Sequence, residues 1–296
     1  MRRVIVLGAL LLVGLAIAQS FGLMDRDHRV RRAWAWEGEV PGDGWVHLRN
    51  RSGSISIEEG SGPEIELVAS KSWTGRRPQD VEFIANRIGN DVYICALYGG
   101  GDKSDCDEDD YDNRETNWFM RKFLRVRPVT VGFTVQVPST ARLNVDTDNG
   151  RVAVDAPLAA LIANTRNGSI KTEQPVGTME AHSRNGSITA RIADGQLAGD
   201  ILLETRNGSV SAELPDSVNA NVILMTRNGR VSTDFPITMS GRVNTRNIEG
   251  VLGNGGPQVK LETRNGSVRL TRRSAVDVEA VAATEAVEAA AVAETP

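Results

Sequence analysis

The chain has few of the residues that build metal centres or nucleic-acid surfaces. Three histidines among 296 residues argue against a multi-histidine metal site, and aromatic residues make up only 5% of the chain. The formal net charge of −4 differs from the strongly positive charge of a typical nucleic-acid-binding protein, and the aromatic side chains on which bases stack are scarce. We therefore expect no cofactor and no nucleic-acid partner.

Long apolar runs are also missing, apart from one at the start of the chain. Residues 4–15 are apolar, follow two arginines and precede the Ala-Ile-Ala triplet at 16–18, a pattern typical of a cleaved export signal. This run is shorter than the about 20 residues that a membrane span needs, so an uncleaved anchor is the less favoured alternative. The pattern predicts a signal peptide at 1–18, no transmembrane span in the mature chain, and a protein of the periplasm, the cell surface or the medium.

Only two cysteines are present, and they lie on either side of an acidic segment. An oxidising compartment outside the cytosol allows Cys95 and Cys106 to form a disulfide, which we predict. Calcium ligation by Asp105, Asp107 and Asp109 is an alternative use of the acidic segment. The spacing of these carboxylates fits no EF-hand or calcium-binding nonapeptide, so the sequence favours a solvated loop without a metal.

Composition divides the rest of the chain into four segments. Residues 19–32 form a polar linker, and 33–138 contain short alternating runs that predict a strand-rich N-terminal cap carrying the acidic disulfide loop. Residues 139–273 form a repeat region. Residues 274–296 are rich in Ala, Val and Glu and are expected to be a disordered tail.

The repeat region is built on the phrase Thr/Ser-Arg-Asn-Gly and close variants of it. Its asparagine recurs every 18 to 22 residues, at Asn149, Asn167, Asn185, Asn207, Asn228, Asn247 and Asn265. A fixed period of about twenty residues is the signature of stacked structural repeats. Apolar residues stand four before and three after the asparagine in most copies, which is typical of strands with one buried face.

The alternation places the apolar residues, the Thr and the Asn on the inner face and the Arg on the outer face. Stacked coils would bring the asparagines about 4.8 Å apart, so that each amide binds the next in a buried ladder. The sequence therefore predicts an all-β protein, a single-stranded β-helix or β-solenoid of about seven coils. An antiparallel meander of Asn-Gly hairpins is the alternative, because Asn-Gly is also a strong hairpin signal.

The phrases "DTDNGRVAV", "NTRNGSI", "HSRNGSI" and "ETRNGSV" resemble the bacterial putative-adhesin family of β-strand-repeat domains of unknown function. The resemblance extends from Trp34 to Leu270. It implies an exported β-helical domain associated with the cell envelope, and it implies no reaction and no binding residues.

The outward arginine is the candidate functional residue of the repeat. It occurs in six copies, as Arg166, Arg184, Arg206, Arg227, Arg246 and Arg264. A column of guanidinium groups suits an anionic envelope polysaccharide or a surface protein, which makes adhesin-like binding the favoured function. A structural scaffold, in which Glu180, Glu204 and Glu262 pair with the column, is the first alternative. A polysaccharide-active enzyme is the second and least favoured, because no catalytic arrangement is visible.

Overall fold

A computed structural model of the chain describes residues 28–39, 42–76, 78–99, 106, 127–174, 176–192, 197–238 and 245–273. The predicted signal peptide at 1–18, the predicted tail at 274–296 and the aspartates proposed as calcium ligands lie outside the described residues. The regions predicted as cap and repeat contribute strands to the same two sheets.

The described residues form twenty strands in two ten-stranded sheets and no α-helix. In spatial order, sheet A contains β1 (His28–Gly38), β4 (Ile65–Thr74), β7 (Val129–Val137), β3 (Ile55–Glu59), β9 (Val152–Asp155), β11 (Ile170–Thr172), β13 (Ile188–Arg191), β15 (Val210–Pro215), β20 (Val268–Arg273) and β17 (Val231–Thr233). Sheet B contains β18 (Asn247–Leu252), β16 (Ala220–Asn228), β19 (Gln258–Asn265), β14 (Ile201–Asn207), β12 (Val176–Asn185), β10 (Leu158–Asn167), β8 (Arg142–Asn149), β2 (Val46–Ser52), β6 (Asp91–Tyr98) and β5 (Val81–Ile88). The predicted all-β class is confirmed.

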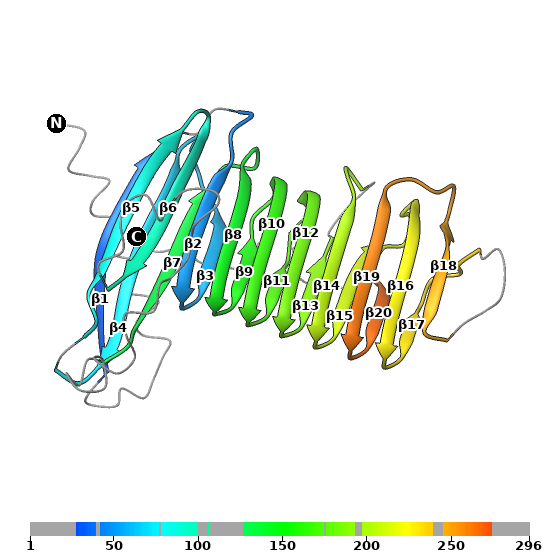
Figure 1. Cartoon of the computed structure of the whole chain (residues 1–296). Helices are drawn as coiled ribbons and strands as arrows, with labels where there is room; N and C mark the ends of the chain where they lie inside the picture. The colour runs from blue at the N-terminus through cyan, green and yellow to red at the C-terminus, as the bar shows by residue number, and fades with distance from the viewer. Residues whose placement is uncertain are drawn as a thin grey trace, which may run out of the picture.

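The repeating unit, which we call a coil, is one strand of sheet B followed through a tight bend by one strand of sheet A. Neighbouring coils pair in parallel in both sheets, as β8 and β9 do with β10 and β11. The coils stand side by side along the long axis of the molecule (Figure 1). Because the strands on either side of each Asn-Gly bend belong to different sheets, the alternative of antiparallel Asn-Gly hairpins is wrong.

The coils do not stack in sequence order, as a simple β-helix requires. The last coil, β19–β20, lies between β14–β15 and β16–β17, so the final repeat separates two earlier ones (Figure 1). The other end has the same kind of interchange, since β2 and β3 lie between the strands β6 and β7 and the coil β8–β9. The coils are therefore out of sequence order at both ends, and the predicted single-stranded β-helix of about seven coils is not confirmed.

Antiparallel strands flank the parallel coils and make both sheets mixed. Strands β1 and β4 extend sheet A beyond β7, and β5 extends sheet B beyond β6. At the opposite end β18 covers the edge of β16. Terminal strands of this kind limit the exposure of unpaired backbone groups, which would otherwise invite pairing with other chains.

The main core lies between the two sheets and follows from strict alternation within the strands. In β8, Leu143, Val145 and Thr147 are buried, whereas the residues between them are half-exposed. The residues equivalent to Val145 are fully buried in every other coil that carries the phrase, namely Ala163, Ala181, Leu203, Leu224 and Leu261. A continuous apolar column therefore runs the length of the stack, and each coil depends on its neighbours to cover it.

Candidate functional site

The threonine of the phrase points inward, as the alternation predicts, and it holds neighbouring coils together. Its hydroxyl donates a hydrogen bond to the carbonyl oxygen of the phrase glycine in the adjacent coil. The O···O distance is 3.3 Å from Thr165 to Gly150 and 2.9 Å from Thr205 to Gly186. These hydroxyls are buried, so the bond supplies the partner that a buried polar group requires.

The glycine of the phrase is required by the close approach of successive bends. A Cβ built on Gly168 would lie 1.8 Å from the carbonyl oxygen of Gly150, and one on Gly186 would lie equally close to that of Gly168. No side chain fits at such a distance from backbone. The glycines therefore set the spacing of the stack at this edge.

The asparagines form a ladder along the same edge. Each side-chain amide donates from Nδ2 to Oδ1 of the asparagine in the neighbouring coil at 2.7–2.8 Å, through Asn149, Asn167, Asn185, Asn207, Asn265 and Asn228 in spatial order. The expectation that this ladder is buried is wrong, because all six side chains are exposed. The cause is the bend, because the alternation of side chains ends at the threonine. Thr165 and Asn167 pair with residues of β8, but Arg166 between them does not, and Arg166 and Asn167 both project from the edge.

Asn247 was expected in the ladder and is not part of it. It begins β18, which runs antiparallel to β16, and its Nδ2 donates instead to Oε1 of Glu249 at 3.1 Å. The residue after Asn247 is Ile248, in place of the glycine that the close approach of the bends demands. That substitution was the sequence signal that this copy does not join the stack.

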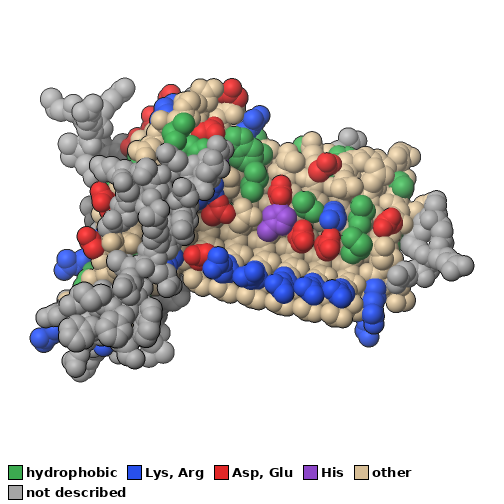
Figure 2. All heavy atoms as spheres, in the orientation of Figure 1, with side chains coloured by type: hydrophobic (Ala, Val, Ile, Leu, Met, Phe, Trp, Pro, Cys, Tyr) green, Lys and Arg blue, Asp and Glu red, His purple; other side chains and the backbone are tan. Residues whose placement is uncertain are grey.

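The phrase arginines of five coils form a single exposed row, which we call the Arg row. In spatial order it consists of Arg166, Arg184, Arg206, Arg264 and Arg227. Figure 2 shows a continuous line of basic side chains along one edge of the molecule. Arg246, the sixth predicted member, is exposed but lies in the turn before β18 and does not belong to a stacked coil.

Most of the Arg row lacks the acidic partners that the scaffold alternative requires. Arg166, at one end, lies 3.6 Å from Asp148 between Nε and Oδ1. Within the described part of the chain, Arg184, Arg206, Arg264 and Arg227 have no carboxylate oxygen within 4.0 Å. Four consecutive guanidinium groups therefore face solvent without a countercharge.

The glutamates expected to neutralise the Arg row contact other side chains. Glu180 Oε1 lies 2.7 Å from His182 Nε2, and Glu204 Oε2 lies 3.8 Å from His182 Nδ1. Glu262 pairs with Lys260 at 2.9 Å. The hydrogen bond from Lys260 to Glu262 raises the pKa of the Lys260 ammonium above its ordinary value.

A long groove of about 1340 Å³ runs beside the Arg row on the outer face of sheet B. Its lining includes the Arg row, Arg51 and Arg246. The threonine and serine positions of the phrase also line it, and because their side chains point inward, they present their backbone to it. The outward residues that directly precede the threonine and serine positions also line the groove, namely Asp146, Asn164, His182, Glu204, Glu262 and Met225. Seven arginines and four carboxylates line the groove, so it carries a net positive charge. The sequence identified the arginines but not the groove.

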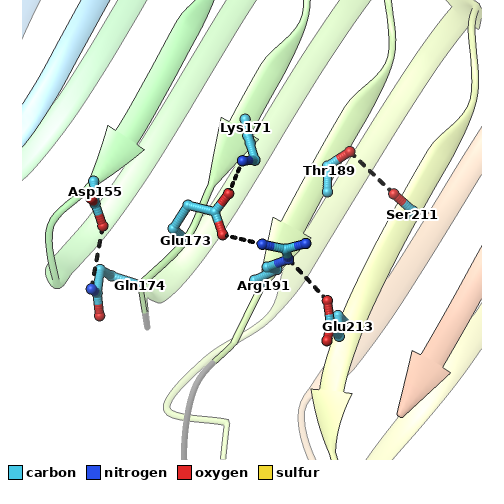
Figure 3. A network of polar contacts seen from close by, with 8 residues as sticks. All are labelled: Asp155, Lys171, Glu173, Gln174, Thr189, Arg191, Ser211 and Glu213. Carbon is cyan, nitrogen blue, oxygen red and sulfur yellow. Dashed lines mark hydrogen bonds and ion pairs between the residues drawn. The ribbon is translucent and has the colours of Figure 1, made fainter. Parts of the chain in front are cut away.

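A separate polar network crosses three coils on the outer face of sheet A (Figure 3). Glu173 accepts hydrogen bonds from Lys171 and from Arg191, the latter at 2.8 Å, and Arg191 also donates to Glu213 at 3.0 Å. Burial tends to raise the pKa of the Glu173 carboxyl, but the bonds from Lys171 and Arg191 outweigh burial and hold that pKa below its ordinary value. The contact with Glu173 raises the pKa of Arg191 in turn. This network binds coils together and lies away from the groove.

The predicted disulfide between Cys95 and Cys106 is present, with both residues fully buried. It belongs to a second apolar cluster, in which Cys95, Ile84, Tyr93 and Leu97 lie on strands β5 and β6 of sheet B. Within the described ranges no three His, Cys, Asp or Glu side chains are grouped so that they could hold a metal ion. The same part of the chain contains no helix that is long and apolar enough to cross a membrane.

A comparison with solved structures found three that match at low sequence identity. A putative cell adhesion protein from Clostridium sporogenes is 10% identical, with 83% of this chain and 99% of that chain covered and a TM-score of 0.47. A putative adhesin from Bacteroides fragilis is 10% identical over 83% and 97% of the two chains, with a TM-score of 0.35. A putative lipid binding protein from Parabacteroides distasonis is 9% identical over 84% and 98%, with a TM-score of 0.21.

No curated protein matches the chain. The sequence model of one family, described as Toastrack DUF4097, matches residues 111–271, which is more than half of the chain. This match confirms the resemblance of the repeated phrases to an adhesin-like β-repeat family of unknown function. The chain belongs to the Toastrack DUF4097 family.

Proposed function

We propose that this protein is an exported, non-enzymatic binding protein of the cell envelope that holds an anionic polymer along the Arg row. The observation that supports the proposal most is that most arginines of the phrase, unlike its other residues, have no evident role in holding the coils together. Its threonine, asparagine and glycine each make contacts between coils, whereas four of the five arginines in the row have no carboxylate within 4.0 Å among the described residues. Export is supported by the disulfide, since such bonds persist in oxidising compartments.

The row suits a polymer better than a small anion. Parallel strands place like residues about 4.8 Å apart, so five arginines span about 19 Å along the axis of the stack. A guanidinium group binds carboxylate or phosphate through two parallel hydrogen bonds. A linear polyanion lying along the axis would therefore contact one guanidinium group in each coil.

The test is binding of the purified protein to polygalacturonate, a linear polymer of carboxylated sugars, over a series of salt concentrations. The triple variant Arg184→Gln, Arg206→Gln and Arg264→Gln is expected to lose about tenfold or more in affinity at low salt, equivalent to about 1.4 kcal/mol. The control, Arg31→Gln, Arg76→Gln and Arg269→Gln, removes the same charge from exposed residues outside the groove and is expected to bind as the unmodified protein does.

Equal losses in both triple variants would mean that net charge, and not the Arg row, attracts the polymer. Absence of binding to polygalacturonate and to inorganic polyphosphate at low salt, in a folded protein, would refute the proposal and favour the scaffold alternative.

A further inference from the structure

Two further rows of polar side chains accompany the Arg row on the edge of the stack. The first is the exposed asparagine ladder, one residue along the chain from each arginine. The second consists of the serines that follow the glycines, and in spatial order these are Ser169, Ser187, Ser209 and Ser267. Ser187 and Ser209 are exposed and the other two are half-exposed. The edge therefore presents a charged row and two neutral hydrogen-bonding rows in parallel.

The asparagine ladder uses only part of its hydrogen-bonding capacity. A side-chain amide has two N–H donors and two acceptor lone pairs. In the interior of the ladder, Asn185 donates one bond to Asn167 and accepts one from Asn207, both at 2.8 Å. One N–H and one lone pair per residue remain, and because the side chains are exposed, both are open to a ligand.

The serine row adds groups of the same kind. The hydroxyl of Ser187 accepts a bond from the backbone N–H of Ser209 at 3.3 Å, which leaves its O–H free to donate. A hydroxyl both donates and accepts, as the unused half of each asparagine amide does. The edge therefore offers donors and acceptors at about 4.8 Å intervals beside the row of positive charges.

We propose that the ligand is an acidic polysaccharide, whose carboxylates bind the Arg row while its ring hydroxyls bind the asparagine and serine rows. This inference rests on the proposed function and specifies its ligand. Sugar hydroxyls exchange donors and acceptors with amides and hydroxyls, whereas polyphosphate offers only acceptors and an acidic peptide has no hydroxyl on its carboxylated side chains. The polymer lies parallel to the long axis of the stack, because all three rows run in that direction.

The experiment compares polygalacturonate, poly-L-glutamate and inorganic polyphosphate, matched for number of charges, on the unmodified protein by calorimetry at moderate salt. Polygalacturonate is expected to bind about tenfold or more tightly than either of the other polymers. Equal affinity for all three would overturn the inference but leave the proposed function standing. Absence of binding by any of them at low salt would overturn both.

A variant on the protein side separates hydroxyl recognition from differences in charge spacing between the polymers. Ser187→Ala with Ser209→Ala removes two exposed hydroxyls that contribute no apolar surface to the core, so the fold is expected to persist. This variant should lose a few-fold in affinity for polygalacturonate and less for polyphosphate, which can only accept hydrogen bonds from these hydroxyls. The control, Thr178→Ala with Ser232→Ala, removes two exposed hydroxyls elsewhere and should change neither. Unchanged polygalacturonate affinity in the first variant, or an equal loss for both polymers, would contradict the inference.

Discussion

Arg206→Gln is expected to stabilise the free protein, because Arg206 stands between two like charges and has no countercharge. Its neighbours in the row are Arg184 on β12 and Arg264 on β19. Two unit charges about 4.8 Å apart repel by about 0.9 kcal/mol in water, so the two neighbours together cost about 1.7 kcal/mol. Screening at 0.15 M salt, where the Debye length is about 8 Å, reduces this by about half, to about 1 kcal/mol.

The assay is thermal unfolding followed by circular dichroism at low and high ionic strength. A gain of about 1 kcal/mol raises the Tm of a domain of this size by about 2–4 °C. The gain should be larger at about 10 mM salt and fall to about 0.3 kcal/mol at about 1 M, where the Debye length falls to about 3 Å. Arg166→Gln is the matched comparison, because Arg166 has Asp148 as a partner and only one arginine neighbour, and it should show little or no gain.

A fall in Tm for Arg206→Gln at low salt would refute this reasoning. It would mean that stacked guanidinium groups, or packing of the arginine stem on the edge, stabilise the coil by more than the charges repel. The Arg row would then serve the fold, and no polymer ligand would be needed to explain it. A gain that does not change with salt would equally exclude repulsion as the cause.

Three other changes test the contacts between coils. Gly186→Ala brings a Cβ to 1.8 Å from the Gly168 carbonyl oxygen and should cost about 3 kcal/mol or more, seen as a lower midpoint of urea unfolding. Asn185→Ala removes two exposed ladder bonds and should cost about 1 kcal/mol in the same assay. The pKa of Glu173 is lowered in the folded protein, so its contribution is complete above the ordinary value of about 4.3 and is lost as the pH falls through the lower folded value. Arg191→Gln should therefore destabilise the protein at pH 7 and flatten the loss of stability below about pH 4, as urea titrations at several pH values would show.

The sequence predicted the buried face of the repeat because identical residues at a fixed period restrict the register of stacked strands. The alternation of strand side chains then predicted that Leu203 and Thr205 point inward and Arg206 outward, and the structure agrees. The same alternation wrongly predicted that Asn207 points inward, because the backbone bends between the threonine and the asparagine and strand alternation ends there. Sequence periodicity holds only as far as the regular strand that produces it.

The order of the coils could not be read from the period. The strands β16 and β19 both end in Thr-Arg-Asn, are followed by glycine and have leucine at the same inward position, so each fits beside β14 by the same rules. Nor could the sequence show which side chain each glutamate would contact. His182 lies between Glu180 and Glu204 at distances that depend on rotamers, and those depend on the shape of the outer face.

The place of the final coil affects how the protein is made. A ribosome releases the chain from its N-terminus at about 5–20 residues per second, so Asn265 follows Asn228 by about 2–7 s. Folds dominated by non-local strand pairing form in milliseconds to seconds, so β16 has time to pair with β14 before its proper neighbour β19 exists. The late coil must then displace an earlier pairing that satisfies the same hydrogen bonds. A chain ending at Leu252 should show that premature pairing directly, as protection of the β14 and β16 amides from hydrogen exchange, and unprotected amides there would mean that the two strands wait for the rest of the chain.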